Sequence, residues 1–168
     1  MIIPVSGINQ EALSDWTTRR ESDLVKISDR IIRVGDTLVT REMRLSFTLD
    51  ATPEKIVAMF KEADKLTRWS AGARSCEILL DVNVRWLTYS TFDFPWPFRQ
   101  ADLITEYRIT RMNSLIQLSY KSGFSNQLNT IGNYSTQQKY EGLWLFLPNE
   151  NRTTEVEFRS YALFNSVI

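Results

Sequence analysis

The stretch LVTREMRLSFTLDATPEKIVAMFKEADKL, residues 38–66, decides the fold, because its apolar residues change period in the middle. Residues 38–49 alternate between apolar and polar, which predicts a strand with one buried and one wet face. The expected buried face holds Met43, Leu45, Phe47 and Leu49, and the expected wet face holds Glu42, Arg44, Ser46 and Thr48. Thr52-Pro53-Glu54 then has the residue types of a helix start. The spacing of Ile56, Phe60 and Ala63 predicts one helix over residues 53–66.

The chain after this helix has the pattern of a sheet. Six further strands are expected at Cys76–Leu80, Val84–Phe92, Asp102–Arg111, Leu115–Ser122, Gln137–Leu147 and Thr154–Phe164. Turn residues separate them, and most connections are short, which favours antiparallel neighbours in chain order over βαβ units. The predicted class is therefore α+β, with a large curved antiparallel sheet and few helices.

Upstream of residue 38, the pattern predicts a strand over Leu24–Ile32 and a turn at Val34-Gly35-Asp36. A short helix is expected from Asn9, with Leu13 and Trp16 on one side. Two short helices cannot cover a sheet of this length. We therefore expect a gap lined by aromatic side chains, which is a physical basis for a ligand cavity.

Composition excludes several functions. The chain has 168 residues, which fits a single domain over 1–168. It has no His and one cysteine, Cys76, so catalysis by a His-containing triad and His- or Cys-cluster metal sites are excluded. Twenty basic residues balance 20 acidic ones, which argues against nucleic-acid binding. No stretch is apolar enough to span a membrane, and residues 1–7 are a poor signal peptide, so a cytoplasmic protein is expected.

Several segments, taken in order, resemble the START (steroidogenic acute regulatory-related lipid transfer) family of the helix-grip superfamily. They are Trp16, the Thr52-Pro53-Glu54 helix start, Arg68-Trp69, the loop FDFPWPFRQAD at 92–102, and Gly142-Leu143-Trp144 with Pro148. The resemblance implies a helix-grip fold and non-covalent, cofactor-free binding of a hydrophobic small molecule or lipid between sheet and helices. It also implies transient contact with membranes.

The sequence departs from the family pattern at two places. Ala101 stands where the family has an Arg before Asp102. The family also ends in a long helix that roofs the cavity, whereas residues 162–168 stop where that helix would begin. Either the chain is a truncated form, or something else covers the sheet.

The candidate ligand-binding residues are Arg85, Tyr89, Tyr107, Tyr120, Trp144 and Phe158. An Arg and phenolic hydroxyls would orient the polar end of an apolar ligand. Arg85 and Tyr89 lie on one side of their strand, but the sequence leaves open whether that side is the cavity or the wet surface. Trp144, Phe146 and Phe158 are either core or cavity wall.

Two other functions stay open. One is an enzyme related to polyketide cyclases and aromatases of the same fold, which would need Arg, Tyr and carboxylate groups inside the pocket. The other is an interaction module whose open groove receives a helix or a second copy. We interpret the remaining charged candidates as surface charge; they are the carboxylate pairs Asp93/Asp102 and Glu155/Glu157 and the pair Arg68/Arg74. We interpret Cys76 as a small buried side chain. Residues 122–135 form either a long loop or a lid.

Overall fold

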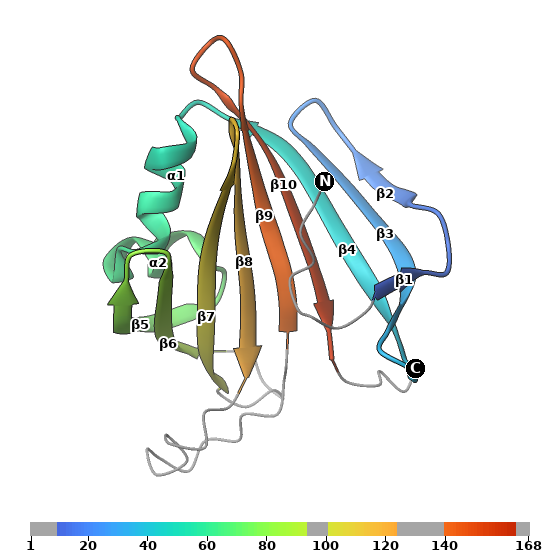
Figure 1. Ribbon diagram of the computed structural model, residues 1–168, viewed down its shortest axis with the longest axis horizontal. Helices are drawn as coiled ribbons and strands as arrows, with labels where there is room; N and C mark the ends of the chain where they lie inside the picture. Colours follow the sequence, from blue (N-terminus) through green and yellow to red (C-terminus); the bar gives the residue numbers. More distant parts are fainter. Residues whose placement is uncertain (1–9, 94–100, 124–139, 164–168) are drawn as a thin grey trace.

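The computed structural model describes residues 10–93, 101–123 and 140–163, and its main feature is one ten-stranded antiparallel sheet (Figure 1). The strands are β1 Gln10–Ala12, β2 Thr17–Glu21, β3 Val25–Val34, β4 Leu38–Leu49, β5 Ala73–Val82, β6 Arg85–Phe92, β7 Ala101–Met112, β8 Leu115–Gly123, β9 Tyr140–Pro148 and β10 Thr154–Ala162. Their order in the sheet is β1-β3-β4-β10-β9-β8-β7-β6-β5, and β2 pairs with β3 beside β1. This architecture confirms the predicted α+β class with a large antiparallel sheet and few helices.

The two halves of the chain meet in the middle of the sheet. Strands β5 to β10 are neighbours in chain order, as their turn signals predict. The last strand, β10, then pairs with β4, so that Thr154 lies opposite Leu49 and Tyr161 opposite Glu42. The Thr154 hydroxyl also donates to the Ala51 carbonyl oxygen at 2.6 Å. We call this β4–β10 pairing the seam.

The predicted helix over 53–66 is two helices, α1 Pro53–Phe60 and α2 Ala63–Trp69. The start is as predicted, with Thr52 at the N-cap position and Pro53 in the first turn. Glu62 is extended, with φ −108° and ψ 101°, and this breaks the helix. The break turns the chain so that both helices bury apolar side chains. These are Ile56, Val57 and Phe60 from α1 and Leu66 from α2.

The predicted helix after Asn9 is wrong in the part that the structure describes. Residues 10–12 and 17–21 are strands that pair with β3. Their side chains are exposed, so an amphipathic helix here would have little to bury. A short isolated helix is marginal in water, whereas β3 offers a row of backbone groups that the two strands satisfy.

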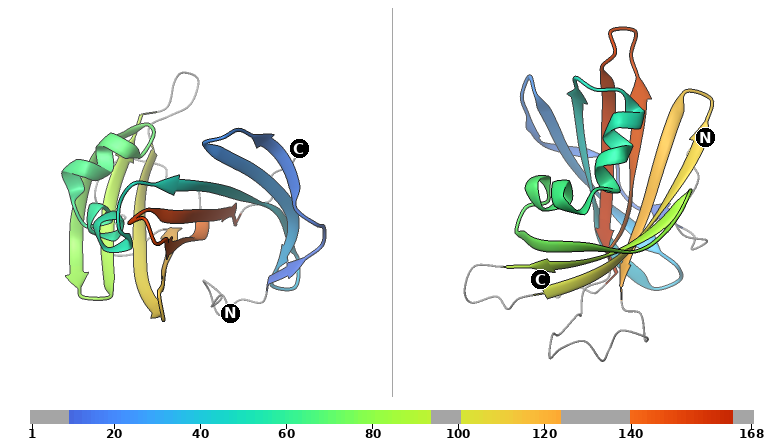
Figure 2. Two further views of the ribbon diagram at one scale, coloured as in Figure 1. Left: turned by 90° about the horizontal axis from the view of Figure 1, so that it is seen from above. Right: turned by 90° about the vertical axis from the view of Figure 1, so that its left-hand side faces the viewer.

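The sheet has two faces of different character. Both helices lie on one side of it (Figure 2), which we call the inner face; the opposite side is the outer face. The main core lies between α1 and the inner face. It contains Ile56, Val57, Phe60, Trp86, Tyr107, Ile116, Leu118, Phe146 and Val156. A second, smaller cluster of Ile32, Val34 and Tyr161 lies on the outer face, since Tyr161 pairs with Glu42 and Val34 with Leu38.

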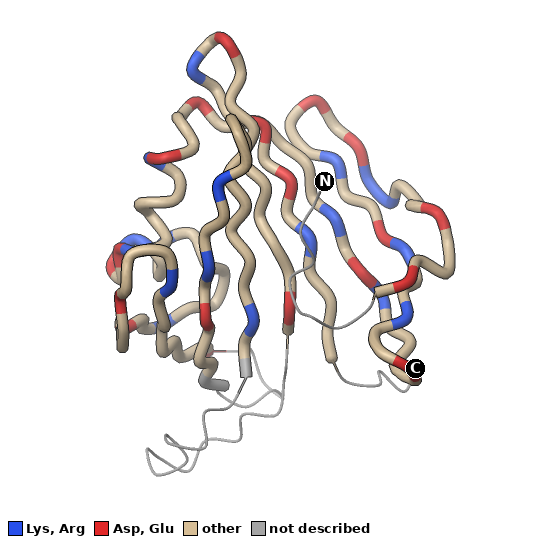
Figure 3. The backbone as a smooth tube through the Cα atoms, viewed as in Figure 1, with Lys and Arg blue, Asp and Glu red and all other residues tan. Residues whose placement is uncertain are grey.

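The bounds and the alternation predicted for β4 are right, but the predicted burial is wrong at Met43, Leu49 and Glu42. Phe47 packs on the core, but Met43, on the same inner face, is 47% exposed, because α1 lies over the other end of the strand. Glu42, expected to be wet, is 4% exposed and accepts a hydrogen bond from Arg30 at 2.7 Å. Charged residues gather on β2, β3 and β4 (Figure 3). The ion pair with Arg30 allows the outer face to bury Glu42, because it balances the charge of the carboxylate.

Some predictions fall outside the described residues. These are the Pro95-Trp96-Pro97 loop, most of the 122–135 segment, and residues 164–168, after which the resemblance places the roofing helix.

Candidate functional site

The aromatic side chains that α1 leaves partly uncovered form the first part of the candidate site. Trp144 on β9 and Phe158 on β10 are cross-strand partners with ring centroids 4.3 Å apart. Tyr120 on β8 stacks on Phe158 at 6.1 Å. Trp69 of α2 approaches Trp144 at 6.2 Å and is 37% exposed. We call Tyr120, Trp144 and Phe158, with the neighbouring Met43 and Leu45 of β4, the apolar platform; it presents carbon surface that an apolar ligand could cover.

Hydroxyl groups cross the same inner face and form its second part. They are Thr88 and Ser90 on β6, Thr105 and Tyr107 on β7, Tyr120 and Ser122 on β8, and Ser160 on β10, and we call them the hydroxyl belt. The strand registers place them together: Thr88 lies opposite Thr105, Thr105 opposite Ser122, and Tyr107 opposite Tyr120. Where the belt meets the platform, the Tyr120 hydroxyl donates to Ser160 Oγ at 2.7 Å.

The phenols of the belt stay protonated. Burial raises the pKa of Tyr107 well above its usual value, and the neighbouring Tyr120 raises it further. Burial likewise raises the pKa of Tyr120, which its hydrogen bond to Ser160 only partly offsets. Both side chains are therefore neutral hydrogen-bonding groups and not bases.

Two of the six predicted ligand-binding residues lie on the other face. Arg85 and Tyr89 do share one side of β6, as predicted, but the register places that side outward, because their neighbour Trp86 packs in the inner core. Arg85 Nη2 donates to Glu106 Oε2 at 2.9 Å, and Arg108 binds the same carboxylate. Burial disfavours the charge of Glu106, but its two Arg partners outweigh this and lower its pKa.

The other four, Tyr107, Tyr120, Trp144 and Phe158, lie together on the inner face. Their binding role stays a prediction. Sequence analysis missed Met43 as an exposed neighbour of this group, as well as the belt residues Thr88, Ser90, Thr105 and Ser160. Cross-strand register, which a single sequence does not supply, is the signal that brings them together.

The remaining polar candidates behave as surface groups. Glu155 and Glu157 share the outer face of β10, and Glu157 is paired with Arg159. Arg74 lies 3.8 Å from Asp93, and both are exposed. Cys76 is half-buried, and burial raises the pKa of its thiol, which disfavours the reactive thiolate. No metal-binding group of three or more Cys, Asp or Glu side chains occurs within the described residues.

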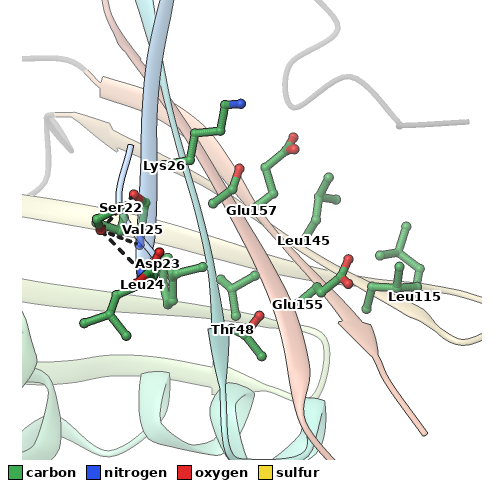
Figure 4. A pocket seen from close by; sticks show the side chains of 14 residues that line it. Ser22, Asp23, Leu24, Val25, Lys26, Thr48, Leu115, Leu145, Glu155 and Glu157 are labelled. Carbon is green, nitrogen blue, oxygen red and sulfur yellow. Dashed lines mark hydrogen bonds between the residues drawn. The ribbon is translucent and has the colours of Figure 1, made fainter. Parts of the chain in front are cut away.

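A pocket of about 540 Å³ lies on the outer face (Figure 4). It extends from the turn at Ser22–Leu24 across β4 and β10 to Leu145 on β9 and Leu115 on β8. Leucine side chains share its lining with Lys26, Glu155 and Glu157. Its walls are therefore mixed and charged, in contrast to the platform.

An open antiparallel sheet that holds two helices on one face and aromatic side chains beside them defines a helix-grip architecture. Solved structures share it. The STAR-related lipid transfer protein of Xanthomonas axonopodis (fragment 25–204) superimposes with a TM-score of 0.76 at 18% identity, over 88% of this chain and 81% of that one. The lipid transfer and protein localization domain of human StarD13 gives a TM-score of 0.75 at 11% identity, over 93% of this chain and 78% of that one. The chain therefore has a START-like helix-grip fold, as the sequence motifs predict.

The Zhui aromatase/cyclase of Streptomyces sp. R1128 shares the fold more distantly, with a TM-score of 0.55 at 9% identity, over 77% of this chain and 71% of that one. Neither a family model nor a curated protein sequence matches the chain. Among the described residues, no helix is long and apolar enough to cross a membrane.

Proposed function

We propose that the protein binds a hydrophobic ligand, such as a lipid, without catalysis, on the inner face of its sheet. One observation carries this proposal: the apolar platform continues the buried core into a region where Met43 stays 47% exposed and Trp69 37% exposed. Apolar surface of this kind gains about 25 cal/mol for each Å² that a ligand covers. The START-like fold supports the proposal, since two proteins that share it are named for lipid transfer.

The geometry favours binding over the cyclase alternative. A cyclase needs cationic and acid–base groups that converge on the substrate. Arg85, the expected cation, is on the outer face and bound to Glu106, and the described inner-face residues of β6–β10 include no carboxylate. Cytoplasmic location, transient membrane contact and the absence of nucleic-acid binding stay predictions from the sequence.

The direct test is a titration of delipidated protein with fluorescent fatty-acyl and sterol probes, for the wild type and two matched variants. Met43→Lys places a charge on the platform, and Thr48→Lys places the same charge on the outer face of the same strand. We expect Met43→Lys to weaken binding about tenfold or more, or about 1.4 kcal/mol, and Thr48→Lys to have little effect. A wild-type protein that binds none of the probes at micromolar concentrations would refute the proposal, as would equal losses in the two variants.

A further inference from the structure

The inner face of the central strands is polar in places but almost free of charge. Its described residues on β6 to β10 comprise aromatic and aliphatic side chains together with the hydroxyl belt. Among them, Arg111, at the end of β7, is the single charged side chain. It is exposed and lies 4.0 Å from Glu54 of α1.

The charged groups that border this face from neighbouring elements are also paired within the protein. Lys61, after α1, lies over the Trp86 ring at 4.9 Å, but its Nζ is bound by Asp81 and by the Asn83 carbonyl oxygen, each at 2.8 Å. On β3, Asp29 lies opposite Met43 of the platform and accepts hydrogen bonds from Arg19 and Arg41. The charge of each of these groups is therefore balanced within the protein.

The belt is suited to neutral polar groups. Each hydroxyl is both a donor and an acceptor, so it can match a ligand hydroxyl, carbonyl or ester. Most of the belt is also shielded from solvent: Thr88 is 1% exposed, Ser90 4% and Ser122 7%. In the described structure the indole Nε1 of Trp86, in the same layer, is buried and has no hydrogen-bond partner. An ionised ligand group placed here would lose its hydration without gaining an opposite charge, which costs several kcal/mol.

We infer that the inner face selects uncharged hydrophobic ligands, whose polar group is a hydroxyl, carbonyl or ester, over ligands that would bring a carboxylate or ammonium group into it. This inference rests on the proposed function and adds the chemical class of the ligand. The ligand's chain would cover Trp144, Phe158 and Met43, and its polar group would meet the Tyr120–Ser160 pair, the half-buried end of the belt.

A matched series of ligands tests this selection on the unmodified protein. Dodecanol, dodecanoate and dodecylammonium have the same chain length and differ in the charge of the end group. Each would be titrated near neutral pH against the fluorescence of the native tryptophans, below its aggregation concentration. We expect dodecanol to bind about tenfold or more tightly than either ion.

The outcomes are distinguishable. Equal or tighter binding of dodecanoate or dodecylammonium would overturn the selection and leave the proposed function intact. Failure of all three to bind would overturn both.

A pair of variants then tests whether the belt is responsible. Tyr120→Phe removes one hydroxyl from the inner face, and Ser119→Ala removes one from the outer face of the same strand. We expect Tyr120→Phe to weaken dodecanol binding about fivefold without weakening binding of dodecane, and Ser119→Ala to change neither. An equal loss for dodecanol and dodecane, or no loss for dodecanol, would contradict the role of the belt.

Discussion

The two faces of β10 are made by alternating residues of one strand, yet their side chains differ in chemical character. Val156, Phe158 and Ser160 face inward, and Glu155, Glu157 and Arg159 face outward. Both faces contain polar groups, so polarity alone does not distinguish them. On β10 the difference is charge: its inner face carries hydroxyls and no charged side chain, whereas its outer face carries the Glu157–Arg159 ion pair. Binding of an apolar molecule requires the first kind of surface, because hydroxyls can be buried at a lower cost than ions.

The same contrast extends along the outer face. Trp16 lies between guanidinium groups there, with Arg44 at 4.2 Å and Arg30 at 4.4 Å from its ring centre. Such contacts contribute about 0.5–1 kcal/mol each where they are exposed. Burial of the large inner-face side chains contributes more for each residue, so we expect stability to depend chiefly on the inner face.

The largest effect on the free energy of unfolding should come from removing an aromatic ring on the inner face. Phe146 is fully buried, whereas the next residue, Leu147, points outward and is 42% exposed. We expect Phe146→Ala to lower the free energy of unfolding by about 3–5 kcal/mol, because it opens a cavity in the core. We expect Leu147→Ala to cost less than about 1 kcal/mol. Urea unfolding measures both, and similar losses would show that the two faces contribute equally.

The next prediction concerns Glu42, one of the buried acidic residues on the outer face. Glu42 is 4% exposed and accepts a hydrogen bond from Arg30 Nε at 2.7 Å. Glu42→Gln keeps the shape but removes the charge that balances Arg30, so we expect a loss of about 1–3 kcal/mol in urea unfolding. An unchanged or higher free energy of unfolding would show that the Arg30–Glu42 pair does not stabilise the fold.

Alkaline pH should lower the free energy of unfolding through titratable groups on the inner face. Because burial raises the pKa of Tyr107 and Tyr120, the folded protein retains protons that the unfolded chain releases above about pH 10. Stability should therefore begin to fall above about pH 9 through the Cys76 thiol, whose pKa burial also raises, and above about pH 10 through the two tyrosines, by about 1.4 kcal/mol per pH unit for each group. Urea midpoints measured between about pH 9 and about pH 11 test this. Tyr107→Phe should reduce the slope, and an unchanged slope would contradict the assignment.

The smallest effect should come from an exposed outer charge. Glu155 is exposed and lies opposite Thr48 and Leu147. We expect Glu155→Gln to change the free energy of unfolding by less than about 0.5 kcal/mol and to leave binding of the fluorescent fatty-acyl probe unchanged. A marked change in probe binding would assign the ligand to the outer-face pocket.

Local pattern was enough to predict the bounds of β4, the start of α1 at Pro53, and the order of the last six strands. It could not place Arg85, because a side chain's face depends on which neighbour packs beside its strand. The helix expected around Trp16 was wrong for a related reason: pairing with β3, the next strand along the chain, outweighed local helix propensity. The aromatic members of the site were found as residue types, but their grouping required the registers of β6 to β10.

The seam has a consequence for the order of folding. Strand β4 is made about 100 residues before its partner β10, as the hydrogen bond from Thr154 to Ala51 illustrates. Until β10 is made, one edge of β4 has no partner, and its apolar inner residues stay accessible to other chains. Pairing over such a separation makes folding slow. A ribosome-bound chain that lacks β10 therefore exposes an aggregation-prone β-sheet edge. We expect the protein to need chaperones more during this interval than after β10 has paired with β4.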